Sequence, residues 1–128
     1  MASTFPFTSA LVTGASSGIG EAMAELLGAA GVPTVVVARR SDRLHALAER
    51  FPSIEVLAAD LADPAARDRV VADLATREVD LLVNNAGFGT LSEFADSEPS
   101  RMAEEIGLNC LALSLLARAV VGGMVSRG

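Results

Sequence analysis

A glycine-rich turn between an apolar run and an amphipathic segment constrains the fold of this chain more than any other feature. Residues 9–13 (SALVT) read as a buried strand, and residues 13–20 (TGASSGIG) follow without periodic burial. A helix is predicted next, because apolar residues recur at helical spacing on one face that should pack against a sheet: Ile19, Met23, Leu26, Leu27 and Ala30. Backbone N–H groups and the helix dipole at such a turn favour an anion, and a pyrophosphate is a natural ligand for it.

Each glycine of this turn has an expected role. Gly14 permits the tight turn after the strand, Gly18 lets the backbone approach phosphates, and Gly20 lets the helix pack closely on the sheet. Ser16 or Ser17 can add a hydrogen bond to a phosphate. The predicted phosphate-binding residues are therefore Gly14, Ser16, Ser17, Gly18, Ile19 and Gly20.

The same turn admits other interpretations. A Walker loop is excluded, because Ile19 and Gly20 stand where that loop needs Gly and Lys. Residues 14–18 also match the Gly-x-Ser-x-Gly elbow of α/β hydrolases, with Ser16 as the nucleophile. The only histidine, His45, lies on the next predicted helix, so a hydrolase triad has no candidates in the required order and geometry. A turn without any ligand is the remaining alternative.

Strands and helices alternate along the rest of the chain. Further strands are predicted at Thr34–Ala38, Ile54–Ala58 and 79–83. The second predicted helix begins at a Ser41 or Asp42 cap and ends before Pro52, and the third runs from an Asp63 cap and Pro64 to about Arg77. The last predicted helix starts at Ser97 and Pro99. Its inward-facing residues are Met102, Ile106, Leu113, Leu116, Val120 and Met124. Right-handed crossovers then produce at least half of a doubly wound parallel α/β sheet, which binds ligands at the carboxyl ends of its strands.

Charge and cysteine content limit the partners and the location. The net charge is −6 with no basic stripe, which argues against nucleic acid. The first cationic side chain is Arg39 and the single cysteine, Cys110, cannot form an internal disulfide, so we predict a cytoplasmic location. Cys110 is expected to be buried, and one His and one Cys offer no metal site. The most apolar run, 108–121, contains Asn109 and Arg118 and is shorter than the roughly 20 residues of a membrane span.

The turn and three later motifs together resemble the classical short-chain dehydrogenase/reductase family. The turn has the family's Thr-Gly-x-x-x-Gly-x-Gly spacing, and Asp60-Leu61 follows the third strand. Asn84-Asn85-Ala86-Gly87 follows the fourth strand, and Asn109 lies midway along the last helix. The resemblance covers essentially the whole chain.

This resemblance implies a Rossmann-type sheet in the order 3-2-1-4 with flanking helices, and it implies site residues. Asp60 and Leu61 would lie beside an adenine ring, Asn85, Ala86 and Gly87 would line the cofactor cleft, and Asn109 would be the helix asparagine of the catalytic tetrad. Without the resemblance, Asp60 reads as a turn former, Asn84 and Asn85 as residues that satisfy strand-end backbone, and Asn109 as a buried hydrogen-bonded side chain.

Arg39 and Arg40 indicate which nicotinamide cofactor is preferred. An Asp or Glu about 20 residues beyond the turn usually accepts a hydrogen bond from the ribose 2′-hydroxyl of NAD, and these arginines occupy that place. Guanidinium groups pair strongly with the 2′-phosphate of NADP, so NADP(H) is expected to be preferred over NAD(H). In the alternative, both arginines are surface charges and Asp42 neutralises one of them.

The family's chemistry needs residues that this chain lacks. It transfers hydride between nicotinamide and a small carbonyl or alcohol substrate, using a Ser, a Tyr as acid and base, and a Lys that lowers the pKa of the Tyr. The 128 residues contain no Tyr, and every cationic residue is Arg. We therefore expect residues 1–128 to be one NAD(P)-binding domain truncated before the fifth strand, inactive alone. A noncatalytic NADP-binding module or sensor is the alternative.

The resemblance also implies a homo-oligomer. In the family, the helix that corresponds to residues 99–126 packs against its copy in a neighbouring subunit. Met102, Ile106, Leu113 and Val120 are therefore expected to serve an interface as well as the core.

Overall fold

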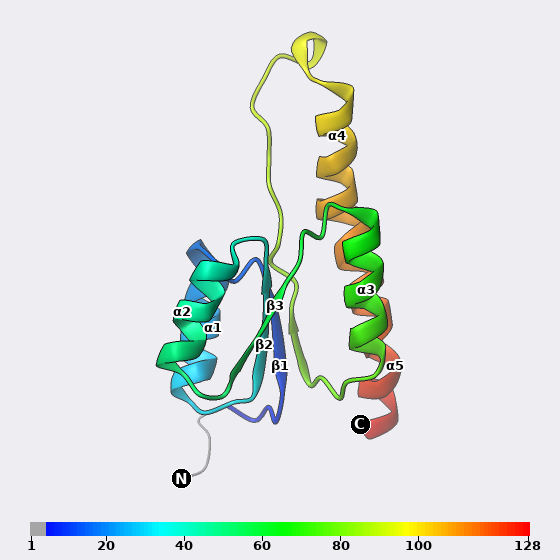
Figure 1. Cartoon of the computed structure of the whole chain (residues 1–128). Coiled ribbons are helices and arrows are strands. Elements are labelled where there is room, and N and C mark those ends of the chain that lie inside the picture. Colours follow the sequence, from blue (N-terminus) through cyan, green and yellow to red (C-terminus); the bar gives the residue numbers. More distant parts are fainter. Residues whose placement is uncertain (1–4) are drawn as a thin grey trace.

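The computed structural model describes residues 5–128, in which strands and helices alternate (Figure 1). The strands are β1 (Ala10–Thr13), β2 (Thr34–Ala38), β3 (Ile54–Ala58) and β4 (Leu81–Val83). The helices are α1 (Gly18–Ala29), α2 (Ser41–Arg50), α3 (Pro64–Ala75), α4 (Pro99–Ile106) and α5 (Leu113–Arg127). A 3-10 helix spans Phe94–Asp96, and a π-helical segment, Gly107–Ala112, joins α4 to α5.

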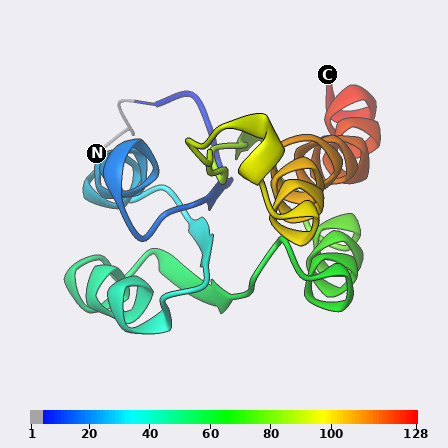
Figure 2. The same cartoon turned by 90° about the horizontal axis from the view of Figure 1, so that it is seen from above.

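The strands form one parallel sheet in the order β3-β2-β1-β4, which confirms the predicted Rossmann-type arrangement. Leu11 of β1 is in register with Val35 of β2 and Leu82 of β4. Every residue of β2 is buried, as expected for a β-branched run covered on both faces. Helices α1 and α2 cover one face of the sheet, and α3 and α5 cover the other (Figure 2).

Several predicted bounds and caps differ from the structure. β2 and β3 have the predicted ends, whereas β1 begins at Ala10 and β4 at Leu81, each inside the predicted strand. The carboxylate of Asp63 accepts from the backbone N–H of Ala66 at 2.8 Å, so the predicted cap of α3 is confirmed. The predicted caps of α2 and α4 are wrong, because Arg40 and Glu98 occupy those positions and neither side chain caps the helix.

The predicted inward face of α1 is partly wrong. Ile19 and Leu26 are 76% and 57% exposed, while Gly20, Ala24 and Leu27 are buried. A Cβ at Gly20 would lie 2.3 Å from the carbonyl oxygen of Gly14. The helix therefore approaches the sheet through its small residues, which turns the large side chains of Ile19 and Leu26 outward.

The last helix is longer and less regular than predicted. Pro99–Arg127 is helical throughout, with the π-helical segment in its middle. Leu116 and Val120 are buried as expected, but Ile106 and Leu113 are 61% and 37% exposed. Cys110 is also exposed, contrary to prediction. The hydrogen bonds of a π-helix join residues five apart and not four, which shifts the side chains around the axis and breaks the regular spacing on which the prediction rested.

This helix also overturns the length argument against a membrane span. It has 29 residues, and its most apolar window of 18 has a mean hydropathy of 1.8, so its length and composition suffice to cross a bilayer. A mostly buried core helix would meet the same criterion, whereas only 17% of this window is buried. Here Ala112, Leu116 and Val120 of this helix pack in the apolar core beneath the sheet.

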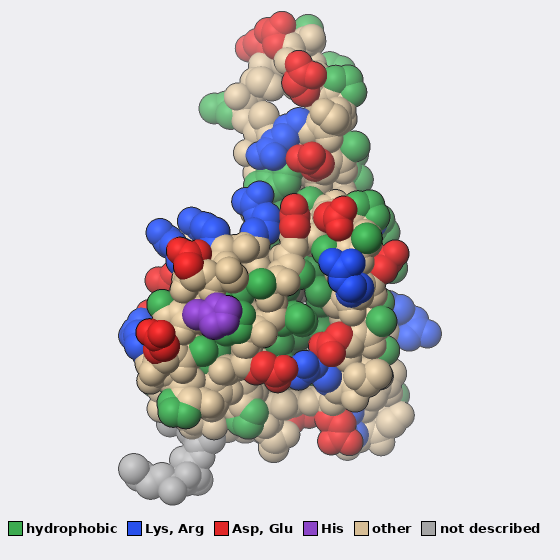
Figure 3. Space-filling view, in the orientation of Figure 1, with side chains coloured by type: hydrophobic (Ala, Val, Ile, Leu, Met, Phe, Trp, Pro, Cys, Tyr) green, Lys and Arg blue, Asp and Glu red, His purple; other side chains and the backbone are tan. Residues whose placement is uncertain are grey.

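A lobe projects beyond the carboxyl ends of the strands (Figure 1). It consists of residues 84–106, namely the connection after β4 together with α4. Leu91 and Phe94 on this connection are exposed. The step between the lobe and the sheet, where arginine side chains gather (Figure 3), is the place where a ligand can bind.

Candidate cofactor-binding site

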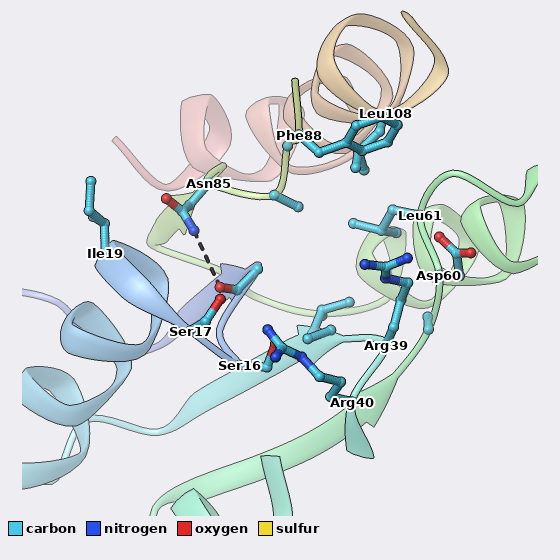
Figure 4. A pocket seen from close by; sticks show the side chains of 16 residues that line it. Ser16, Ser17, Ile19, Arg39, Arg40, Asp60, Leu61, Asn85, Phe88 and Leu108 are labelled. Carbon is cyan, nitrogen blue, oxygen red and sulfur yellow. Dashed lines mark hydrogen bonds between the residues drawn. The ribbon is translucent and has the colours of Figure 1, made fainter. Parts of the chain in front are cut away.

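A cleft of about 290 Å³ lies at the carboxyl ends of the strands. It is lined by all the predicted cofactor-binding residues except Gly18 and Gly20: Gly14, Ser16, Ser17, Ile19, Arg39, Arg40, Asp60, Leu61, Asn85, Ala86 and Gly87. Val37, Ala38, Ala59, Phe88 and Leu108 complete the wall, and the sequence analysis missed them. The motifs that are separated along the chain thus meet at one site (Figure 4).

The glycine turn forms one wall of this cleft. Gly14 and Gly18 adopt φ values of 65° and 59°, which favour glycine over other residues. Gly20 does not line the cleft. It packs beneath the turn, where a Cβ would lie 2.3 Å from the carbonyl oxygen of Gly14. Ser17 precedes α1 and its side chain makes no capping hydrogen bond, so the N–H groups of the first helical turn remain available to an anion.

Asn85 and Thr13 join the turn to the end of β4. The Asn85 amide nitrogen donates to the carbonyl oxygens of Thr13 and Gly14 at 3.2 and 3.3 Å. The Thr13 hydroxyl oxygen accepts from the backbone N–H groups of Asn85 and Ala86 at 3.0 and 2.9 Å. Thr13 is fully buried, so these bonds satisfy its hydroxyl. It is a positioning residue that the sequence analysis left out, although it begins the glycine motif.

Asn109 lies behind the cleft and does not line it. Its side-chain oxygen accepts from the backbone N–H of Phe88 at 3.0 Å, and its amide nitrogen donates to the Phe88 carbonyl at 2.6 Å. Asn84 makes a separate bond: its side-chain nitrogen donates to the backbone carbonyl of Leu113, the first residue of α5, at 2.7 Å. The two asparagines thereby fix the connection after β4 against the π-helical segment and the start of α5. A Cβ at Gly87 would lie 2.9 Å from the Asn109 oxygen, so a larger residue there would have to displace the Asn109 side chain.

Arg39 and Arg40 project from the end of β2 at the rim of the cleft. In Figure 4 the Arg40 side chain extends toward Ser16, while that of Arg39 lies beside Leu61 and Asp60. Both arginines are exposed, and within residues 5–128 neither forms an ion pair, with Asp42 or any other carboxylate. The Asp60 carboxylate accepts from the N–H of Ala62 at 3.0 Å, which fixes the turn after β3.

A second hollow of about 480 Å³ continues from the cleft past Arg39 toward α4. Arg101 of α4 stacks over the ring of Phe88, with its guanidinium carbon 3.9 Å from the ring centroid. Arg101 also pairs with Glu104 at 3.3 Å. Phe88, which borders both hollows, is therefore held by its backbone through Asn109 and by its ring through Arg101.

The hydrolase interpretation of the turn finds no support. The Nδ1 atom of His45 is 2.7 Å from the carbonyl oxygen of Ser41, on its own exposed helix. The Ser16 carbonyl instead accepts from the guanidinium of Arg43 at 3.1 Å. In the described part of the chain, no three His, Cys, Asp or Glu residues form a group that could hold a metal ion.

Residues 8–128 match the sequence model of the short chain dehydrogenase family. The chain is 35% identical over 119 residues to mouse (Mus musculus) L-xylulose reductase, which covers 93% of this chain and 48% of the reductase. Among solved structures, an NADPH complex of a short-chain dehydrogenase from Sphingobium yanoikuyae superposes with a TM-score of 0.88 and 38% identity, covering 93% of this chain and 49% of that chain.

L-Sorbose reductase from Gluconobacter frateurii, solved with NADPH and L-sorbose, has a TM-score of 0.80 and 37% identity, covering 100% of this chain and 51% of that chain. The chain thus spans about half the length of the relatives it matches.

Proposed function

The chain belongs to the short chain dehydrogenase family, and from that premise we propose that it is the NADP(H)-binding part of a reductase. The reductase would transfer hydride between the cofactor and a small carbonyl or alcohol substrate. The cofactor would occupy the cleft at the carboxyl ends of the strands.

The observation that carries the proposal is the pair of guanidinium groups of Arg39 and Arg40. They stand at the rim of the cleft with no carboxylate partner within residues 5–128. An NAD-preferring site places an acidic side chain here. Two unpaired arginines would repel no part of NAD, but they would form charge-assisted hydrogen bonds with the extra phosphate of NADP. NADP(H) should therefore bind more tightly than NAD(H).

The other residues of the cleft fit the rest of the same cofactor. The first turn of α1 offers unpaired N–H groups and the positive end of a helix dipole to a pyrophosphate. Leu61 is 4% exposed and, with Leu108, gives the cleft an apolar side suited to an adenine ring. When bound, NADP(H) supplies or accepts the hydride, while the residues of this chain bind and orient the cofactor.

Asn109 would contribute to this orientation, since it fixes the backbone of Phe88 at the cleft. The family's acid and base chemistry needs a Tyr and a Lys, which the 128 residues do not contain. The chain by itself should therefore bind NADPH without oxidising it. A noncatalytic NADP-binding module or sensor, the second candidate, would share this binding, and only the reductase would oxidise NADPH as a whole protein.

The test is calorimetric titration of the chain with NADPH and NADH, followed by assay of NADPH oxidation with a panel of aldehydes and ketones. We expect NADPH to bind about ten- to a hundredfold more tightly than NADH, as one charge-assisted contact would produce. Equal affinities, or no binding, would overturn the cofactor assignment. Robust NADPH oxidation by the pure chain would overturn the prediction that residues 1–128 alone are inactive.

We also propose that the protein self-associates through residues 99–126. Ile106, Leu111 and Val121 of this helix are exposed, which suits an apolar interface, whereas Val120 is 5% exposed and belongs to the core. Sedimentation velocity tests this, and a monomer at all concentrations would contradict it. A cytoplasmic location and the absence of nucleic-acid and membrane partners stay predictions.

A further inference from the structure

Arg43 contacts the glycine turn from outside the cleft. It lies in the first turn of α2, and its Nη1 donates to the carbonyl oxygen of Ser16 at 3.1 Å. Ser16 lines the cleft and is 6% exposed, while Arg43 does not line the cleft. The bond therefore links the second helix of the fold to the turn that is proposed to bind the pyrophosphate.

The direction of this bond determines how the next peptide group is oriented. A trans peptide is planar, and its C=O and N–H point in opposite directions. With the Ser16 carbonyl directed to Arg43, the N–H of Ser17 points away from α2. Ser17 also lines the cleft, and its N–H is the last before α1 begins at Gly18. Rotation of this peptide would place a carbonyl oxygen, which repels phosphate, where an N–H donor now lies.

Within the described residues, the guanidinium of Arg43 forms no ion pair with a carboxylate. Glu21 and Arg50 lie with Arg43 around one shallow hollow, but within residues 5–128 no carboxylate oxygen comes within ion-pair distance of Arg43. The neighbouring Arg50, by contrast, pairs with Glu25 of α1 at 2.7 Å. Arg43 thus donates a hydrogen bond to the turn and, within residues 5–128, takes part in no surface ion pair.

We infer that Arg43 is a positioning residue for the cofactor, which holds the Ser16–Ser17 peptide in the orientation that binds the pyrophosphate. The inference rests on the proposed NADP(H) binding and deepens it. Because the pyrophosphate is common to both nicotinamide cofactors, Arg43 supports NADPH and NADH equally. Arg39 and Arg40, in contrast, act on the 2′-phosphate alone.

The experiment compares Arg43→Met with Arg50→Met as the matched control on the same helix. Arg43→Met should weaken the binding of both NADPH and NADH about three- to tenfold, the effect of one lost hydrogen bond. Arg50→Met should change neither affinity. Arg43→Lys, which keeps the charge without the planar guanidinium, should give intermediate affinities and provides the test if Arg43→Met does not fold.

A second measurement separates positioning from general stability. The amide resonances of Ser17 and Gly18 in the unliganded protein should shift in Arg43→Met and stay unchanged in Arg50→Met, with equal melting temperatures. Unchanged affinities or unchanged Ser17 resonances in a protein that binds NADPH would overturn the inference. If Arg43→Met lost affinity for NADPH but kept its affinity for NADH, the inference would also be overturned, because Arg43 would then contact the 2′-phosphate. Absence of nucleotide binding by the unmodified chain would instead refute the proposed function.

Discussion

The two ends of the sheet use arginine in opposite ways. At the amino ends of the strands, Arg77 donates to both carboxylate oxygens of Glu55 at 2.8 Å and to Asp73 at 2.7 Å. At the carboxyl ends, Arg39 and Arg40 have no carboxylate partner within residues 5–128. Paired cations hold elements of the chain together, whereas unpaired cations beside a cleft keep a positive potential for an anionic ligand.

The ion pairs at the amino ends of the strands shift the pKa values of their partners. The hydrogen bonds from Arg77 lower the pKa of Glu55 below its usual value, and the pKa of Arg77 itself is raised by Glu55 and Asp73. Hydrogen bonds from Thr8, with Arg127 nearby, lower the pKa of Asp80. These groups are stabilised in their charged forms by the fold itself. Changes at the two ends of the sheet should therefore have separable effects on stability and on binding.

The largest effect is expected at the carboxyl ends. Exchanging Arg39 for Asp together with Arg40 for Ala should weaken NADPH binding by about a hundredfold or more, because two charge-assisted contacts are lost and a negative charge is added. NADH affinity should be retained, since Asp can accept from a ribose 2′-hydroxyl. Calorimetric titration with both cofactors measures the ratio. Unchanged selectivity would show that these arginines do not contact the 2′-phosphate.

Asn109 is expected to contribute to the stability of the fold as well as to the orientation of Phe88 at the cleft. Asn109→Ala removes both bonds to Phe88 and should lower the free energy of unfolding by about 1 to 3 kcal/mol, because the Phe88 backbone loses its partners. Asn84→Ala, which removes the side-chain hydrogen bond to the carbonyl of Leu113, should lower the free energy of unfolding by less. Urea denaturation measures both. A variant at Asn109 with wild-type stability would show that the clamp is dispensable.

Arg77→Met probes the paired end. The variant should lower the free energy of unfolding by about 1 kcal/mol or less, since Glu55 and Asp73 are partly exposed and water screens their attraction. NADPH affinity should not change, because Arg77 lies at the opposite end of the sheet. A loss of NADPH affinity comparable to that of the Arg39 and Arg40 variant would break the proposed division between the two ends.

The smallest effect is a pH dependence of the same pair. A lowered carboxyl pKa in the folded state stabilises the fold above the carboxyl's usual pKa of about 4.3, and this contribution is lost as the pH falls through the folded-state value. The stability difference between the unmodified chain and Arg77→Met should therefore shrink on acidification below about pH 4. Thermal melts between neutral and acidic pH measure it. A difference that grows with acid would have the wrong sign.

Local sequence patterns predicted the secondary structure correctly where the residues themselves strongly prefer one backbone conformation. The β-branched run of β2 and the Asp63-Pro64 start of α3 are found as predicted, because their preferences are local. Parallel strands end at the same edge of the sheet, so one cleft is lined by Gly14, Ser16, Ser17 and Ile19 of the glycine turn together with Asp60-Leu61 and Asn85-Ala86-Gly87. The order of the sheet followed from the family resemblance.

Features that depend on tertiary contacts could not be predicted in this way. The buried face of α1 is defined by how closely Gly20 approaches Gly14, which helical spacing does not reveal. The π-helical segment leaves Cys110 exposed, and no residue type marks its position. The bond from Arg43 to Ser16 joins residues of two different elements, so no local pattern indicates it.

The most direct test of the central assignment compares two ligands that differ by one phosphate. The chain is titrated with adenosine 2′,5′-bisphosphate and with adenosine 5′-monophosphate, neither of which carries nicotinamide. The account predicts that the 2′-phosphorylated nucleotide binds about ten- to a hundredfold more tightly, and that this advantage disappears when Arg39 and Arg40 are replaced. Equal affinity of the two nucleotides for the unmodified chain would contradict it.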